Sequence, residues 1–511
     1  MPFHQQLHHH AAATPDKPAF IIDGKVRSFA ELENRSQLFW AYVASLPGSR
    51  KELPILNRVE KVVALDLGNH LLFPELFVGA THGNNVCAVL DPKMLPSQLQ
   101  DILTRLRPDL IVTETTSTSV ADIARRMGFN VETADAFVKP RQGNPPADPK
   151  QPPETEDGTF LVNFTSGTTS QPKAYSRSRA AWRASLARGV PLFGLQDAPA
   201  TMCPGALAHG LALYSLAETL HSGGTFHTVK QWNADLVANA LSRGDIDRLV
   251  AVPTMVSALA ERVSPPSPIF PSIRDVLTAG AKLSSKHVAL MRSMFPQARI
   301  MEYYGASELG FVSVSTVHPS DPETPIGTVG KAYPGVEISV RRSEQMLGDG
   351  AVGTIYVKSD LICDGYLWGD DGKAFRVDSS GATVGDIGEL KPNGALTVMG
   401  REGGMLITGG FNVYVSEVEA VLKNIAEVDE AVVLGVDDAY LGTRLVAILC
   451  GSFEGGKGIL EEAGKSLPRY KIPRDLYRTS SWPMTTSGKI ARGKIAELLQ
   501  DGQYDSIELT T

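Results

Sequence analysis

The chain of 511 residues is poor in cysteine and has no long apolar run. Its four cysteines, Cys87, Cys203, Cys363 and Cys450, lie far apart and form no C-x-x-C pair, which argues against a disulfide framework and a cysteine zinc site. No segment approaches the ~18 apolar residues that a membrane span needs. The first residues also lack the charged start and apolar core of a secretion signal. We therefore expect a cytoplasmic protein without a membrane span.

An excess of positive charge is also absent. The chain has 49 Lys and Arg residues against 56 Asp and Glu residues, a net charge of −7, so it offers no general attraction for nucleic acid. With 43% hydrophobic and 21% charged residues the composition is that of a globular protein. The length exceeds what one compact core supports, which predicts at least two domains.

Short apolar runs alternate with helix-like stretches, a rhythm typical of βα units around parallel strands. The runs are residues 62–64, 110–112, 249–252 and 300–303, and the helix-like stretches are 96–107 and 285–294. The predicted class is α/β. A proline-rich stretch at 139–158 is expected to join two lobes of a large N-terminal domain, residues 1–400, and short units after about Arg401 predict a smaller α+β domain, residues 401–511.

The most informative segment is Thr165-Ser166-Gly167-Thr168-Thr169-Ser170-Gln171-Pro172-Lys173, directly after the apolar run 160–164. Glycine lets a backbone approach a ligand, hydroxyl and N–H groups donate hydrogen bonds to phosphate oxygens, and lysine adds a positive charge. A plain polar loop has the same composition. Other segments of the chain favour a phosphate-binding loop.

Four later segments accompany this loop in a fixed order: 303–308 (YYGASE), 385–401, 405–419 with a glycine pair, and 483–492 with Gly488-Lys489. Together they resemble the signatures of the adenylate-forming superfamily, in its branch of acyl-CoA synthetases and aryl-acid ligases. The resemblance implies a large N-terminal domain and a mobile C-terminal domain. It also implies that a carboxylic acid reacts with ATP to give an acyl-adenylate, and that CoA then takes the acyl group, with ATP, Mg2+ and CoA as cofactors.

The resemblance also assigns roles to residues of these segments. Expected catalytic residues are Thr165, Lys173, Glu308 and Lys489, with Glu308 as the magnesium ligand and Lys489 bridging the substrate carboxylate and the α-phosphate. Expected nucleotide- and CoA-binding residues are Ser166, Gly167, Thr168, Thr169, Tyr304, Gly305, Ser307, Asp386, Arg401, Gly409 and Gly410. Among them, Tyr304 would stack on adenine, Asp386 would bind the ribose with the help of Arg401, and Gly409 and Gly410 would line the pantetheine tunnel.

For the substrate, the stretch 206–211 is apolar apart from His209. Amino-acid-activating relatives place an aspartate in this region, so an α-amino acid is not expected. His209 fits either a substrate contact or a structural histidine. Ala279, Gly280, Gly310 and Phe311 resemble pocket walls with room for an apolar acyl group, and an aliphatic chain and an aromatic acid both stay open.

Several alternatives remain. The acceptor could be the phosphopantetheine of an acyl carrier protein in place of free CoA, and the family also contains luciferases. A non-catalytic nucleotide sensor is disfavoured by the retained Lys173, Glu308, Asp386 and Lys489. A homodimer is left open. The N-terminal His4, His8, His9 and His10 could crowd a metal ion, but no acid accompanies them before Asp16 and terminal segments are often mobile, so we do not expect a metal site there.

Overall fold

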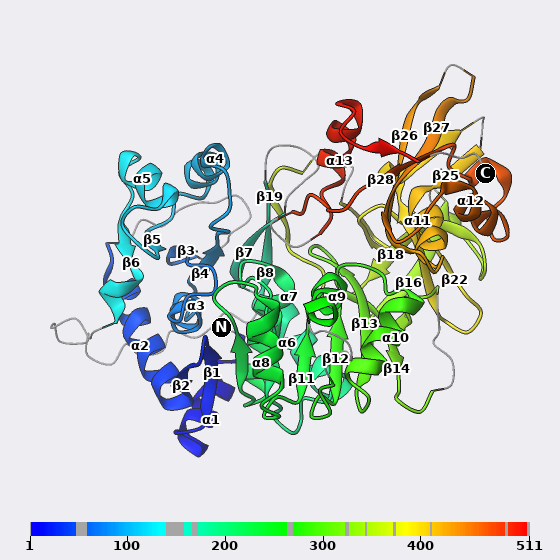
Figure 1. The fold of residues 1–511 in the computed structure, drawn as a ribbon. Helices are drawn as coiled ribbons and strands as arrows, with labels where there is room; N and C mark the ends of the chain where they lie inside the picture. The colour runs from blue at the N-terminus through cyan, green and yellow to red at the C-terminus, as the bar shows by residue number, and fades with distance from the viewer. Residues whose placement is uncertain are drawn as a thin grey trace.

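The computed structural model describes residues 2–47, 59–138, 158–165, 172–262, 269–321, 327–342, 345–370, 372, 375–408, 411–438, 440–485 and 489–507. These residues form a large N-terminal domain and a smaller C-terminal domain, as predicted, and Figure 1 shows the smaller domain in yellow to red at one end of the larger one. The proline-rich stretch 139–158 lies, except for Gly158, outside the described residues.

Two large, mostly parallel sheets build the N-terminal domain. In the described residues, the first sheet has the order β15 (Lys331–Ala332), β14 (Gly310–Val317), β13 (Arg299–Ala306), β12 (Asp275–Thr278), β11 (Arg248–Val250), β9 (Thr201–Met202), β10 (Phe226–Thr228), β1 (Pro18–Ile22), β2 (Lys25–Ser28). The second has the order β19 (Gly365–Trp368), β8 (Lys173–Ser178), β7 (Thr159–Thr165), β4 (Val86–Val89), β3 (Val62–Asp66), β5 (Leu110–Thr113), β6 (Val131–Thr133). The α/β class is therefore confirmed.

Helices cover both faces of these sheets. The helices are α1 (His4–Ala13), α2 (Phe29–Ser45), α3 (Phe73–Ala80), α4 (Pro96–Leu106), α5 (Ser119–Arg126), α6 (Arg179–Leu192), α7 (Gly210–His221), α8 (Ala234–Leu241), α9 (Pro253–Arg262) and α10 (Ser285–Met294). The largest core cluster joins the two sheets through helices such as α3 and α7, and it includes Leu65, Leu216 and Phe226. Strand residues alternate between faces, so that Leu277 belongs to this central core while its neighbour Val276 packs with α8, α9 and α10 on the outer face.

A third sheet leads from the large domain to the small one. Its strands are β16 (Glu337–Arg342), β17 (Gln345–Met346), β18 (Val352–Lys358), β20 (Arg376–Asp378), β21 (Gly381–Thr383), β22 (Asp386–Leu390) and β23 (Leu396–Arg401). The small domain contains β24 (Met405–Thr408), β25 (Phe411–Tyr414), α11 (Val415–Lys423), β26 (Val428–Asp438), β27 (Gly442–Gly451), α12 (Gly456–Gly464), β28 (Asp475–Arg478), α13 (Arg492–Gln500) and β29 (Asp505–Ser506). It has its own apolar core, with Val418, Val433 and Ala447 fully buried. None of the described helices is long and apolar enough to cross a membrane.

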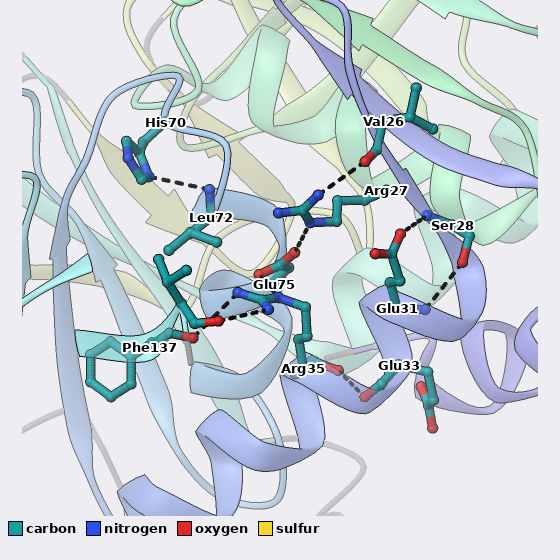
Figure 2. Close-up of polar contacts among 12 residues, drawn as sticks. Val26, Arg27, Ser28, Glu31, Glu33, Arg35, His70, Leu72, Glu75 and Phe137 are labelled. Atoms are coloured by element: carbon teal, nitrogen blue, oxygen red, sulfur yellow. Dashed lines mark hydrogen bonds and ion pairs between the residues drawn. The ribbon is translucent and has the colours of Figure 1, made fainter. Parts of the chain in front are cut away.

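A buried carboxylate fastens the N-terminal elements to the second sheet. Figure 2 shows Glu75 of α3 between two guanidinium groups: Arg27 Nε donates to it over 3.0 Å and Arg35 Nε over 2.6 Å. The Glu75 side chain is 2% exposed, and burial raises its pKa while the two arginines oppose that shift. Ser28 and Glu31 form a capping box at the start of α2. Strand β2, helix α2 and helix α3 are thereby held together.

The N-terminal histidine segment is part of the fold. Helix α1 buries Leu7, and the preceding Phe3 is also buried. The ring of His4 lies 3.9 Å, between ring centres, from that of His82, which in turn stacks on Trp40 at 4.3 Å. Burial, with Arg179 nearby, lowers the pKa of His82 to about 3, and it lowers the pKa of His4 as well. These buried histidines are neutral in the folded protein.

This packing predicts a loss of stability in acid. A histidine with a pKa of about 3 when folded and of about 6.5 when unfolded stabilises the fold above about pH 6.5. That stability falls, by up to about 1.4 kcal/mol per pH unit, as the pH drops toward the folded pKa. Urea unfolding at about pH 7 and about pH 5 should therefore show a smaller pH-dependent loss for His82→Gln than for the wild type, by about 1–2 kcal/mol. Equal losses in the two proteins would contradict the buried, neutral state of His82.

Candidate active site

A tight turn between β13 and β14 carries Ser307 and Glu308. The two strands approach so closely at its base that a Cβ atom on Gly305 would lie 2.3 Å from the carbonyl oxygen of Gly310, and Gly310 has φ +74°. Neither position accepts a side chain without a backbone shift. The turn therefore needs the two glycines, and they fix the direction in which Ser307 and Glu308 project.

Strands β8 and β19 of the second sheet meet this turn. The hydroxyl of Tyr366 donates to Glu308 Oε1, and burial raises the pKa of Tyr175 in β8, which Ser307 and Glu308 also influence. Lys173 Nζ lies 5.6 Å from the ring centre of Tyr366. The structure thus brings Lys173, Ser307 and Glu308, which come from different sheets, to one place.

The hydroxyl-rich segment lies in sequence between β7 and β8. Thr165, the last residue of β7, pairs with Lys173, the first residue of β8, so both ends of the loop are fixed. The side chain of Thr165 and the residues Ser166, Gly167, Thr168 and Thr169 lie outside what the structure describes, as do Gly409 and Gly410. Their predicted roles stay predictions.

A buried carboxylate links β13 to the end of the large domain. Tyr304 OH donates to Asp386 Oδ2 over 2.5 Å, and Arg401 Nε donates to Asp386 Oδ1 over 2.7 Å. Asp386 and Arg401 are also cross-strand partners in β22 and β23. Asp386 is 7% exposed, whereas the side chain of Arg401 is 60% exposed. Burial, together with the charge of Asp386, raises the pKa of Tyr304, so that this hydroxyl stays a donor.

Lys489 reaches this region from the small domain. Its Cε lies 3.4 Å, and its Nζ 4.0 Å, from the place that a Cβ atom would take on Gly280, which has φ +86°. Lys489 as a whole is exposed, but partial desolvation of its ammonium group, and to a lesser extent the positive charge of Arg401, lowers its pKa. The loop that holds Gly280 is fastened by Glu302, whose Oε1 accepts a hydrogen bond from Leu283 N over 2.8 Å. Burial raises the pKa of Glu302 to about 7.

The predicted substrate residues fall into two environments. Ala279 and Gly280 follow β12 at the edge where Lys489 lies, and Gly310 closes the turn described above. Phe311 is enclosed in an aromatic cluster: its ring stacks on Tyr333 at 4.9 Å between ring centres and meets Tyr303 edge-on at 4.7 Å. Only 7% of Phe311 is exposed, so its predicted contact with a substrate stays a prediction.

His209 stands at the start of α7, where its Nε2 lies 3.4 Å from Asp91 Oδ2. The preceding loop is held by Asn69, which accepts from Leu207 N and donates to the carbonyl oxygen of Gly205. Beside Asp91 lies Asp66, and burial together with the charge of Asp91 raises the pKa of Asp66 to about 7. The sequence analysis did not identify this pair of acids beside His209. Their positions gave a signal, because Asp66 ends β3 and Asp91 follows β4, at the carboxyl edge of parallel strands where ligands bind. The sequence analysis also did not identify Tyr366 as a partner of Glu308, and no local sequence pattern indicates this contact.

Comparison with known proteins shows the family of this chain. The family model of the AMP-binding enzyme matches residues 7–367, and that of the AMP-binding enzyme C-terminal domain matches residues 417–489. The chain belongs to the AMP-binding enzyme family. The predicted membership in the adenylate-forming superfamily is thereby confirmed.

The relatives of this AMP-binding enzyme include acyl-CoA ligases. It is 30% identical over 491 residues to the uncharacterized acyl-CoA ligase YhfT of Bacillus subtilis (strain 168), covering 94% of this chain and 97% of YhfT. It is 31% identical to the putative long chain fatty acid-CoA ligase VraA of Staphylococcus epidermidis, covering 67% of this chain and 72% of VraA. The structure of Bacillus subtilis o-succinylbenzoate CoA synthetase MenE with the acyl-adenylate OSB-AMP has a TM-score of 0.80, at 22% identity over 96% of this chain and 97% of MenE. That likeness supports the fold.

We predict that replacing Asp386 weakens nucleotide binding. If Asp386 binds the ribose of the nucleotide, Asp386→Ala removes a charged hydrogen-bond acceptor worth about 1.5–3 kcal/mol, or about 10- to 100-fold in affinity. Isothermal titration with AMP should show this loss, while Asp349→Ala, in an exposed turn, should bind as the wild type does. A folded Asp386→Ala protein with unchanged AMP affinity would place the ribose elsewhere.

Proposed function

We propose that this AMP-binding enzyme activates a carboxylic acid as an acyl-adenylate and transfers the acyl group to the thiol of CoA. The enzyme class is an AMP-forming acid–thiol ligase, in line with the family and with the acyl-CoA ligases among its relatives. The observation that carries the proposal is the position of Lys489, from the small domain, beside Gly280 of the large one and near Arg401 at the domain boundary. A mobile cation is thereby supplied where a carboxylate and a triphosphate would have to approach each other.

The reaction requires two displacements. A carboxylate oxygen attacks the α-phosphorus of ATP, the bond to the bridging oxygen breaks, and pyrophosphate leaves. The CoA sulfur then attacks the acyl carbon, the thiol proton is lost, and AMP leaves. No protein nucleophile is needed, so orientation and neutralisation of charge carry the catalysis. Lys489 would stabilise the charge that gathers between carboxylate and phosphate in the first step.

The residues of the turn fit a magnesium ion. Tyr366 holds one oxygen of Glu308, which leaves the second oxygen for a cation that prefers oxygen ligands. In the described residues no group of three or more His, Cys, Asp or Glu side chains could hold a metal ion, and Mg2+ commonly binds through one or two carboxylates together with substrate phosphates. We propose Glu308 as its protein ligand, and the ion would neutralise charge on the phosphates.

For the acid, we propose an apolar acyl group bound near His209, Ala279, Gly280 and Gly310. The apolar stretch before His209 offers no aspartate for an ammonium group, which disfavours an α-amino acid. An acyl carrier protein as acceptor, a homodimer, the cytoplasmic location and the boundary at residue 401 stay predictions.

A screen of carboxylic acids tests the function. The wild-type enzyme with ATP and Mg2+ should release AMP in the presence of at least one aliphatic or aryl acid, and CoA should be converted to its thioester. AMP release from no acid would refute the ligase. Thioester formation only with a carrier protein would shift the acceptor away from CoA.

We predict that replacing Lys489 slows adenylate formation but not thioester formation. Lys489→Ala should lower carboxylate-dependent exchange of pyrophosphate into ATP on the order of 10²–10³-fold, because it removes a donor at the developing charge. Thioester formation from a supplied acyl-adenylate should persist. Lys494→Ala, on the exposed face of α13, serves as the control. Undiminished exchange in Lys489→Ala would refute the assignment.

A further inference from the structure

A second lysine joins the two domains away from their junction. Lys286, in the first turn of α10, donates from Nζ to the carbonyl oxygens of Ile425 at 2.6 Å, Ala426 at 3.0 Å and Val428 at 2.5 Å. Its neighbour Ser285 donates to Asn424 Oδ1 over 3.2 Å. Helix α10 belongs to the large domain, and the acceptors follow α11 in the small domain (Figure 1).

The chemistry of this contact makes it strong and specific. An ammonium group has three donors and no acceptor, and all three find carbonyl oxygens here. The carbonyls lie just beyond the C-terminus of α11, where peptide groups lack helical partners and the helix dipole is negative. The nearby carboxylates of Glu427 and Asp429 add attraction for the same charge. Loss of the ammonium would leave three carbonyls without this donor.

In the amino-acid sequence, Lys286 lies close to a residue of the candidate active site. Lys286 follows Gly280 by six residues, and the loop between them is fastened by the hydrogen bond from Leu283 to Glu302. Lys489 of the small domain packs at Gly280. Other polar contacts between the domains, such as Ser416 with Met399 and Glu402 with Thr354, lie at the junction itself. The Lys286 contact therefore holds the C-terminal end of α11, whereas the Ser416 contact holds its first turn.

We propose that Lys286 is a positioning residue for adenylate formation: it clamps the end of α11 so that Lys489 stays at the site. This inference rests on the proposed function. The family resemblance implies a mobile C-terminal domain that lines the pantetheine tunnel with Gly409 and Gly410, so under the proposed function the clamp opens between the two half-reactions. The clamp then favours the first half-reaction and gives no help to the second.

The test compares the half-reactions in Lys286→Met, which keeps the apolar stem and removes the charge. With the acid that releases most AMP in the screen above, carboxylate-dependent exchange of pyrophosphate into ATP should fall at least about 5-fold. Thioester formation from the corresponding acyl-adenylate and CoA should equal or exceed that of the wild type. Lys465→Ala, at an exposed position directly after α12, should leave both rates unchanged. Unchanged exchange in Lys286→Met, or an equal loss in both half-reactions, would overturn the proposal.

A measurement without substrate separates this inference from the proposed function. Trace labelling with acetic anhydride, read by mass spectrometry, should modify Lys489 several-fold faster in Lys286→Met than in the wild type, with Lys494 as the internal reference. An unchanged labelling rate would refute the clamp even if the wild type proves to be a ligase, and faster labelling would support the clamp even if no acid is activated. Should Lys286→Met fail to fold, as judged by thermal unfolding, Ser285→Ala must show the same direction with a smaller change, and no change would overturn the proposal.

Discussion

The carboxylate of Asp386 is the interaction on which the geometry of the candidate site depends. It lies nearly buried between a hydroxyl from β13 and a guanidinium from β23, so it joins the main sheet of the large domain to the strand that leads into the small domain. A buried carboxylate is stable when its oxygens accept strong hydrogen bonds. Since Arg401 also lies near Lys489, the same contact defines where the tail of the chain meets the large domain.

Glycine determines how closely the other parts approach. Gly305 and Gly310 allow β13 and β14 to touch backbone to backbone, and at Gly280 a Cβ atom would already be in van der Waals contact with the Lys489 side chain. Each position pairs a missing side chain with a functional candidate nearby. The site is thus assembled from rigid strand ends, and its precision comes from backbone contacts that tolerate little variation.

Much of this arrangement could be predicted from the sequence. The alternation of apolar runs and helix-like stretches gave the α/β class because strand and helix periods differ, and the order of the motifs gave the family. The convergence of Lys173, Ser307 and Glu308 was expected from the resemblance, which assigns all three to one nucleotide site. Other features depend on contacts between distant segments with no local signature. Tyr366 reaches Glu308 through the pairing of β19 with β8, and Lys286 contacts carbonyl oxygens about 140 residues away. The aromatic cluster around Phe311, next to the register shift between Tyr304 and Gly305, was likewise not indicated by the sequence motif.

The place of Lys489 in the chain has a consequence for synthesis. The large domain, with its own sheets and core, is complete on the ribosome long before residue 489 is made. Under the proposed reaction, a nascent or prematurely terminated chain holds a nucleotide site without the cation that joins acid to phosphate. Such fragments would lack the proposed adenylation activity, so the reaction requires the small domain as well as the large one.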